Sequence, residues 1–111
     1  MAEDLWYPFD NGATLGHEGS EQGIILRDEE HPSEARITLE RDGSIAPFVI
    51  TCGIYGCMMH TRFFTLEAGA SSQYDQMKTA LSDLLVAAYD GSQEKRRLFL
   101  DAVAAFVERF P

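Results

Sequence analysis

The fold is decided by GSIAPFVITCGIYGCMMHT, which spans residues 43–61. These nineteen residues between Asp42 and Arg62 include no Asp, Glu, Lys or Arg. In a chain with a formal net charge of -9, so long a gap indicates backbone that has been withdrawn from water. The two glycines of Cys52-Gly-Ile-Tyr-Gly-Cys57 indicate where the stretch folds back. We therefore expect two neighbouring strands joined by a hairpin.

Alternating apolar and polar residues extend this sheet toward the N-terminus. Turn signals lie at His31-Pro32-Ser33 and at Asp42-Gly43, so the predicted strands are residues 23–30, 34–41, 44–52 and 57–66. Together they predict a four-stranded antiparallel meander. Pro47 cannot donate to a strand ladder, and we expect a bulge there.

Hairpin geometry then predicts which side chains share a face. We set Glu29 opposite Glu34, Arg41 opposite Ser44, and Cys52 opposite Cys57. One face becomes almost wholly apolar in this register, and its predicted core residues are Leu26, Ile37, Leu39, Phe48, Ile50, Met59 and Phe63.

Two amphipathic helices follow the strands. The first is predicted to begin at Ser72, where a capping-box-like pattern places Asp75 three residues later, and to end at Gly91. Ser92 is the expected N-cap of the second helix, which runs to the end of the chain. The apolar residues expected to cover the sheet are Leu81, Leu84, Ala88, Phe99, Val103 and Phe106. The predicted fold class is α+β, with both C-terminal helices packed on one face of the sheet.

Residues 1–22 have no sustained period and are predicted to form an irregular arm packed on a single domain of residues 23–111. The 111 residues and 45% hydrophobic content suit one such domain. The acidic start, the two closely spaced cysteines and the short apolar run predict a cytoplasmic protein that does not cross a membrane.

Negative charge is concentrated at the front of the chain. Residues 1–42 hold eleven acidic and three basic residues, giving -8, whereas residues 43–111 hold seven and six, giving -1. Such a surface repels nucleic acids and anionic lipids, so neither is an expected partner. Solubility alone also explains the charge.

The second sheet face gathers basic side chains in this register. Arg27, Arg36, His60 and Arg62 could bind an anionic ligand, because guanidinium groups match carboxylates and phosphates. Cross-strand pairing with Glu29, Glu34 and Glu40 is the simpler explanation.

The pattern Cys52-x4-Cys57-x2-His60 raises the possibility of a metal site. Alternation places His60 on the face opposite Cys57, so one ion would not reach all three, and we expect buried structural thiols, no metal and no cofactor. The sequence has no catalytic signature, and an enzyme using Cys57 or His60 is the least supported hypothesis.

Apolar residues left over on the second face favour protein contacts. The leading hypothesis is a non-enzymatic interaction module that forms a homodimer through this face, with another protein as a possible partner. The predicted interface residues are Trp6, Ile25, Val49, Tyr55, Met58 and Phe64.

Overall fold

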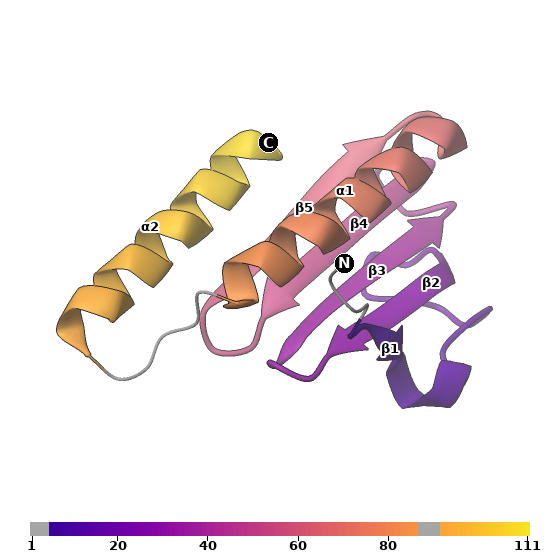
Figure 1. Cartoon of the computed structure of the whole chain (residues 1–111). Helices are drawn as coiled ribbons and strands as arrows, with labels where there is room; N and C mark the ends of the chain where they lie inside the picture. The colour runs from indigo at the N-terminus through magenta and orange to yellow at the C-terminus, as the bar shows by residue number, and fades with distance from the viewer. Residues whose placement is uncertain (1–4, 87–91) are drawn as a thin grey trace.

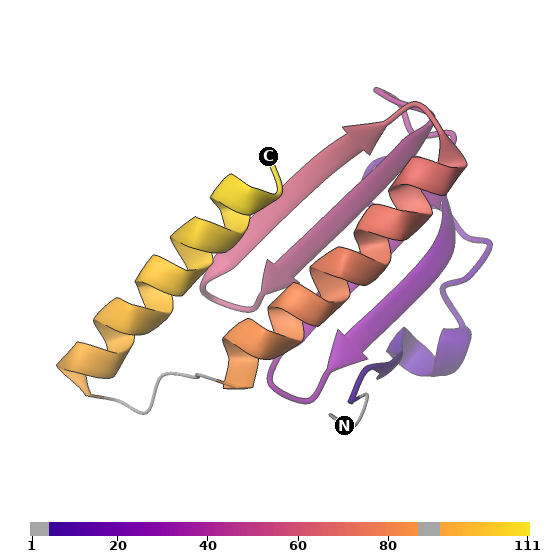
Figure 2. The same cartoon turned by 45° about the horizontal axis from the view of Figure 1, so that its top comes forward.

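The computed structural model describes residues 5–86 and 92–111. One face of an antiparallel sheet is covered by the first of two C-terminal helices, and the second helix lies beside the first at the edge of the sheet, as Figures 1 and 2 show. In chain order the elements are β1 (Tyr7–Pro8), the 3-10 helix η1 (Phe9–Gly12), β2 (Ile24–His31), β3 (Ala35–Arg41), β4 (Phe48–Ile54), β5 (Met58–Phe64), α1 (Glu67–Val86) and α2 (Gln93–Arg109). The predicted α+β class with two C-terminal helices is confirmed.

The sheet has five strands in the order β1-β2-β3-β4-β5, so the prediction of four was one strand short. The additional strand is Tyr7–Pro8, which pairs with Glu30 and Glu29 of β2. A two-residue strand leaves no alternation to read in a sequence, which is why the arm appeared irregular throughout.

The core lies between the sheet and the helices. Alternate residues of β3 and β4 face α1, whose Tyr74 and Met77 are fully buried against them. Of the predicted core residues that the structure describes, the buried ones are Ile37, Leu39, Ile50, Leu81, Leu84 and Phe106, and the partly buried ones are Leu26, Phe48, Phe99 and Val103. Ala88 and Gly91 lie outside the described residues.

The predicted register between β3 and β4 was wrong by four residues, because Arg41 pairs with Phe48 rather than Ser44. The Asp42 N–H donates to the Pro47 carbonyl at 2.7 Å, so a loop through residues 42–47 replaces the tight turn. Pro47 therefore precedes β4 and marks no bulge within it. An even shift preserves alternation, and for this reason the faces of β3 and β4 are as expected.

The predicted register between β4 and β5 was wrong by an odd number, because Cys52 pairs with His60 rather than Cys57. This reverses the faces of β5. Met59 and Phe63, which were predicted core residues, are 81% and 48% exposed on the face away from the helices, called the open face below. The cause is the turn, in which Gly56 adopts φ +75° and the Cys57 N–H donates to the Ile54 carbonyl.

The predicted register between β2 and β3 was also wrong by an odd number, because Glu29 pairs with Ile37 rather than Glu34, and β2 is interrupted by a bulge between Ile25 and Arg27. Beyond it Arg27 lies on the helix side and Asp28 on the open face, the reverse of the prediction for both residues. Irregular pairing of this kind has no reliable signal in one sequence.

Both helices contain the predicted apolar stripes, but α1 begins at Glu67, five residues before the predicted start at Ser72. Ala70 is fully buried in this first turn, so packing on the sheet stabilises helix in a segment whose Gly69 disfavours it. Ser92 is the N-cap of α2 as predicted, and its side chain accepts a hydrogen bond from the Lys95 N–H.

Candidate functional site: a pocket on the open face

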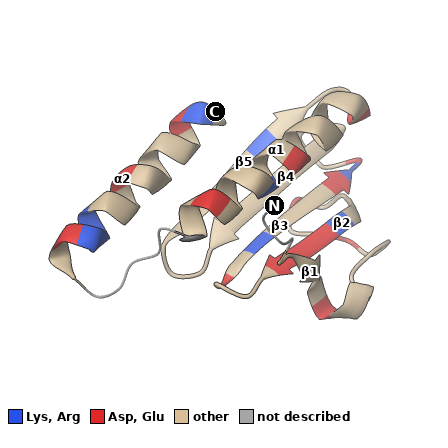
Figure 3. Ribbon diagram, viewed as in Figure 1, with Lys and Arg blue, Asp and Glu red and all other residues tan. Residues whose placement is uncertain are grey.

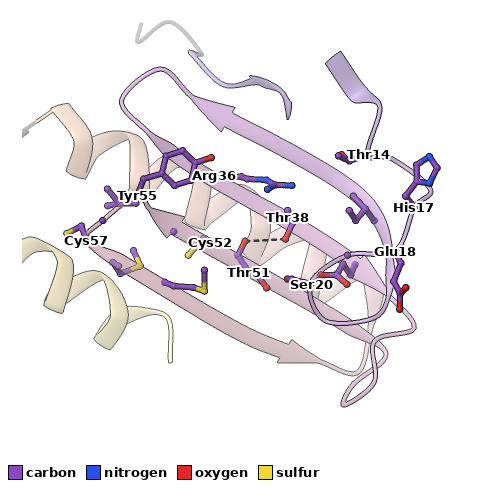
Figure 4. Close-up of a pocket in the computed structure, with 18 residues that line it drawn as sticks. Thr14, His17, Glu18, Ser20, Arg36, Thr38, Thr51, Cys52, Tyr55 and Cys57 are labelled. Carbon is purple, nitrogen blue, oxygen red and sulfur yellow. Dashed lines mark hydrogen bonds between the residues drawn. The ribbon is translucent and has the colours of Figure 1, made fainter. Parts of the chain in front are cut away.

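A pocket of about 670 Å³ is hollowed into the open face of the sheet. Figure 4 shows Thr38 and Thr51 at its centre, Tyr55 and Cys57 at one end, and the loop carrying His17, Glu18 and Ser20 at the other. Apolar residues, among them Ile25 and Met59, complete the lining. The size is that of sites that hold small organic ligands.

Two hydroxyl groups lie on the floor of the pocket. Thr38 and Thr51 are directly opposite each other on β3 and β4, and the Thr38 hydroxyl donates to the Thr51 carbonyl at 3.4 Å. Thr51 Oγ1 is buried and has no hydrogen-bond partner among the described residues. A buried polar atom without a partner is uncommon, because it loses hydration without compensation.

The basic group of the pocket, Arg36, is already neutralised. Its guanidinium donates two hydrogen bonds to the buried carboxylate of Asp28, at 2.9 and 2.6 Å, and these hold the pKa of Arg36 above its ordinary value. The ring of Phe9 lies 3.6 Å from the guanidinium carbon, and Thr14 donates to the same carboxylate. An anion would have to compete with Asp28 for this arginine.

Glu40 fixes the loop that forms one wall. Its carboxylate is 1% exposed and accepts hydrogen bonds from the backbone N–H groups of Glu21 and Gly23. Gly19 approaches so closely that a Cβ there would lie 2.5 Å from the Glu40 carboxyl carbon. The wall is therefore held by a buried acid that sequence reasoning had paired with arginines.

Tyr55 anchors the opposite end. Its hydroxyl donates to Glu30 at 2.6 Å, and the Tyr7 hydroxyl donates to the other oxygen at 2.8 Å. These two bonds lower the pKa of Glu30, while burial and the bond to Glu30 raise the pKa of Tyr55 to about 12. The turn between β4 and β5 is thereby tied to β1 and β2.

The four predicted anion-binding residues do not converge. Only Arg36 lies on the open face. The other three lie on the helix side. Arg27 stacks on Tyr74 and contacts Glu29 and Asp75. His60 contacts the Phe110 carbonyl, and Arg62 donates to the Pro111 carbonyl and to Gln73. The observed registers of β2 and β5 reverse the predicted faces of Arg27, His60 and Arg62 and so separate them from Arg36.

The predicted interface residues also differ in their placement. Tyr55 is half exposed, whereas Trp6, Ile25 and Val49 are buried, and Met58 and Phe64 pack partly against the core. Trp6 donates from its indole nitrogen to Ser82 at 2.7 Å, so the arm begins on the helix side before it reaches the open face. The exposed apolar side chains that the sequence analysis missed on this face are Met59 and Phe63.

The cysteines were expected to be buried together, and this was wrong for Cys57, which is exposed in the turn while Cys52 is buried. Burial raises the pKa of the Cys52 thiol to about 12. Both are free thiols in the structure. Across residues 5–86 and 92–111, no cluster of three or more His, Cys, Asp or Glu side chains could hold a metal ion.

Among the described helices, none is long and apolar enough to cross a membrane. Comparisons with protein families, with curated proteins and with solved structures gave no match to this chain.

Proposed function

We propose that the protein is a non-enzymatic interaction module that self-associates through the β5 strip, defined as Met59, Thr61 and Phe63 on the open face. The observation that carries this proposal is the exposure of Met59 and Phe63, which is 81% and 48%. Large apolar side chains gathered on one edge of a sheet are typical of contact surfaces.

Charge favours this strip as the place where two copies meet. Figure 3 shows acidic residues along β2, whereas β4 has no charged residue and β5 has only Arg62. Arg62 lies on the helix side, where it is engaged by the C-terminal residue Pro111. Two copies of a chain with a net charge of -9 repel each other, and the repulsion is smallest where their contacting surfaces are uncharged.

The alternative function, an anion-binding module, gains no support from the geometry. Arg36 lies on the opposite face of the sheet from Arg27, His60 and Arg62, and it is already paired with Asp28.

Sedimentation equilibrium of the wild type and of Phe63→Glu tests the proposal. We expect a dimer for the wild type at micromolar concentration, and a 12.4 kDa monomer for Phe63→Glu, because the new carboxylate would be buried without a partner at the contact. Higher salt should strengthen the wild-type dimer, since screening weakens the repulsion between two acidic chains.

Leu98→Glu is the matched control. Leu98 is 60% exposed on α2, so this variant adds the same charge away from the β5 strip and should stay dimeric. A wild type that sediments only as a monomer would rule out self-association and leave another protein as the partner to be sought. A dimer broken by Leu98→Glu and kept by Phe63→Glu would move the contact to α2.

A further inference from the structure

The charged groups lining the pocket on the open face restrict what it can bind. Arg36 is neutralised by Asp28, and the Glu40 carboxylate is occupied by backbone N–H groups. Glu18 is the remaining carboxylate in the lining. Because Arg36 is paired with Asp28, the lining has no free guanidinium group that could bind an anion. The carboxylate of Glu18 and the negative charge of the whole protein would repel an anion.

The apolar part of the lining suits a flat or flexible hydrocarbon body. Met59 of β5 lies on one side of the floor and Ile25 of β2 on the other. Methionine side chains adapt to irregular shapes and make favourable contacts with aromatic rings. A volume of about 670 Å³ accommodates a ligand of two or three rings.

The two floor hydroxyls supply the polar contact. Thr38 uses its proton on the Thr51 carbonyl and keeps free lone pairs. Thr51 gains no hydrogen bond in its present rotamer, and rotation about χ1 exchanges its hydroxyl with its methyl group. A ligand with an N–H or O–H group therefore recruits these hydroxyls without breaking another side-chain bond of Thr51.

We propose that this pocket binds an uncharged amphipathic small molecule, with its apolar body against Met59 and Ile25 and a neutral hydrogen-bonding group on Thr38 and Thr51. Of the residues that carry this inference, only Met59 also belongs to the β5 strip, because Ile25, Thr38 and Thr51 lie outside it.

Two fluorescent probes that share a skeleton test the proposal by titration. N-phenyl-1-naphthylamine is uncharged and carries one N–H, whereas 1-anilinonaphthalene-8-sulfonate adds an anionic sulfonate to the same rings. We expect one molecule of the neutral probe per chain, bound at least about ten-fold more tightly than the sulfonate, which corresponds to about 1.4 kcal/mol. Equal or tighter binding of the sulfonate would overturn the ligand class.

Two variants locate the site. Thr51→Val should weaken binding of the neutral probe by about five-fold while leaving the melting temperature unchanged or higher, because it removes a hydroxyl that makes no bond in the fold. Thr38→Trp should fill the floor and abolish binding. Thr79→Val is the matched control, since Thr79 is exposed on α1 and is not part of the lining.

Binding of the neutral probe that survives both Thr51→Val and Thr38→Trp would place the probe elsewhere and refute the site. Thr38→Trp is informative only if its circular dichroism and melting transition match the wild type, and Thr51→Val provides the independent reading if they do not. Phe63→Glu should retain the probe even as a monomer, which separates this proposal from the proposed self-association.

Discussion

The open face of the sheet has two halves that differ in what covers them. Beneath the N-terminal arm and the loop after β3, Ile25 and Val49 are 6% and 0% exposed, although both point away from the helices. On β5, Met59 and Phe63 point the same way and are among the most exposed apolar side chains of the described chain. One half is therefore closed by the chain itself, and the other is exposed.

The covered half is held by specific contacts rather than by apolar burial alone. Ile25 of β2 makes two backbone hydrogen bonds with the arm. Its carbonyl accepts from the Gly16 N–H, and its N–H donates to the His17 carbonyl. The backbone N–H of Ser44, in the loop after β3, donates to the Glu21 carbonyl and so ties that loop to the arm. The described residues place no comparable segment over β5.

Removing the anchor of the arm should have the largest effect. Trp6→Ala deletes an indole that is 9% exposed, bonded to Ser82 and packed edge-on against His31. We expect a loss of about 3 to 5 kcal/mol in the free energy of unfolding, measured by urea denaturation. Leu5→Ala is the control, because Leu5 is half exposed and should change stability little. Equal losses for both variants would mean that the arm has no specific anchor.

Releasing the arm over the open face should cost less. Glu40→Ala leaves the buried N–H of Gly23 and that of Glu21 without their acceptor, and we expect a loss of about 1 to 3 kcal/mol. Hydrogen exchange should accelerate for the Gly16 and Ile25 amides, which bond across this interface. Glu18→Ala, on the same loop but exposed, should leave exchange unchanged. Protection that persists in Glu40→Ala would show that the backbone bonds alone hold the arm.

Much of the fold could be predicted from the sequence because it depends on alternation and on helical periodicity. The faces of β3 and β4 were correct even though their register was four residues off, since an even slip conserves alternation. The turn at Gly56 inverted β5, and with it the assignment of Met59 and Phe63. A three-residue turn with glycine at a positive φ is a known hairpin type, so this signal was present in the sequence.

The candidate site was less predictable because it depends on contacts between distant segments. Arg36 was placed on the correct face, but its pairing with Asp28 depends on a bulge in β2. Glu40 is buried by an arm whose sequence has no periodicity. The residues next to Glu40 in the sequence do not indicate that its hydrogen-bond partners are backbone N–H groups. Trp6 was predicted to contact a second protein chain, whereas in the structure its side chain belongs to the core of its own chain.

The smallest expected effect concerns the link between the two halves, where Tyr55 and Tyr7 both donate to Glu30. Tyr55→Phe should cost about 0.5 kcal/mol near neutral pH, because the bond is at the surface.

The pKa of Glu30 is lowered in the folded protein, so the stability it contributes is present above its ordinary pKa of 4.5 and is lost as the pH falls through the lowered value. The pKa of Tyr55 is raised, so its contribution is present below pH 10 and is lost as the pH rises toward 12. The difference in unfolding free energy between wild type and Tyr55→Phe should therefore form a plateau that declines on both sides. Glu30→Gln should remove the acid decline, and Tyr7→Phe should reproduce that decline without altering the exposure of the turn between β4 and β5. A difference that does not change from pH 3 to pH 11 would show that the hydroxyl of Tyr55 is not bonded to Glu30 in solution, and that the turn is free to move with the uncovered half.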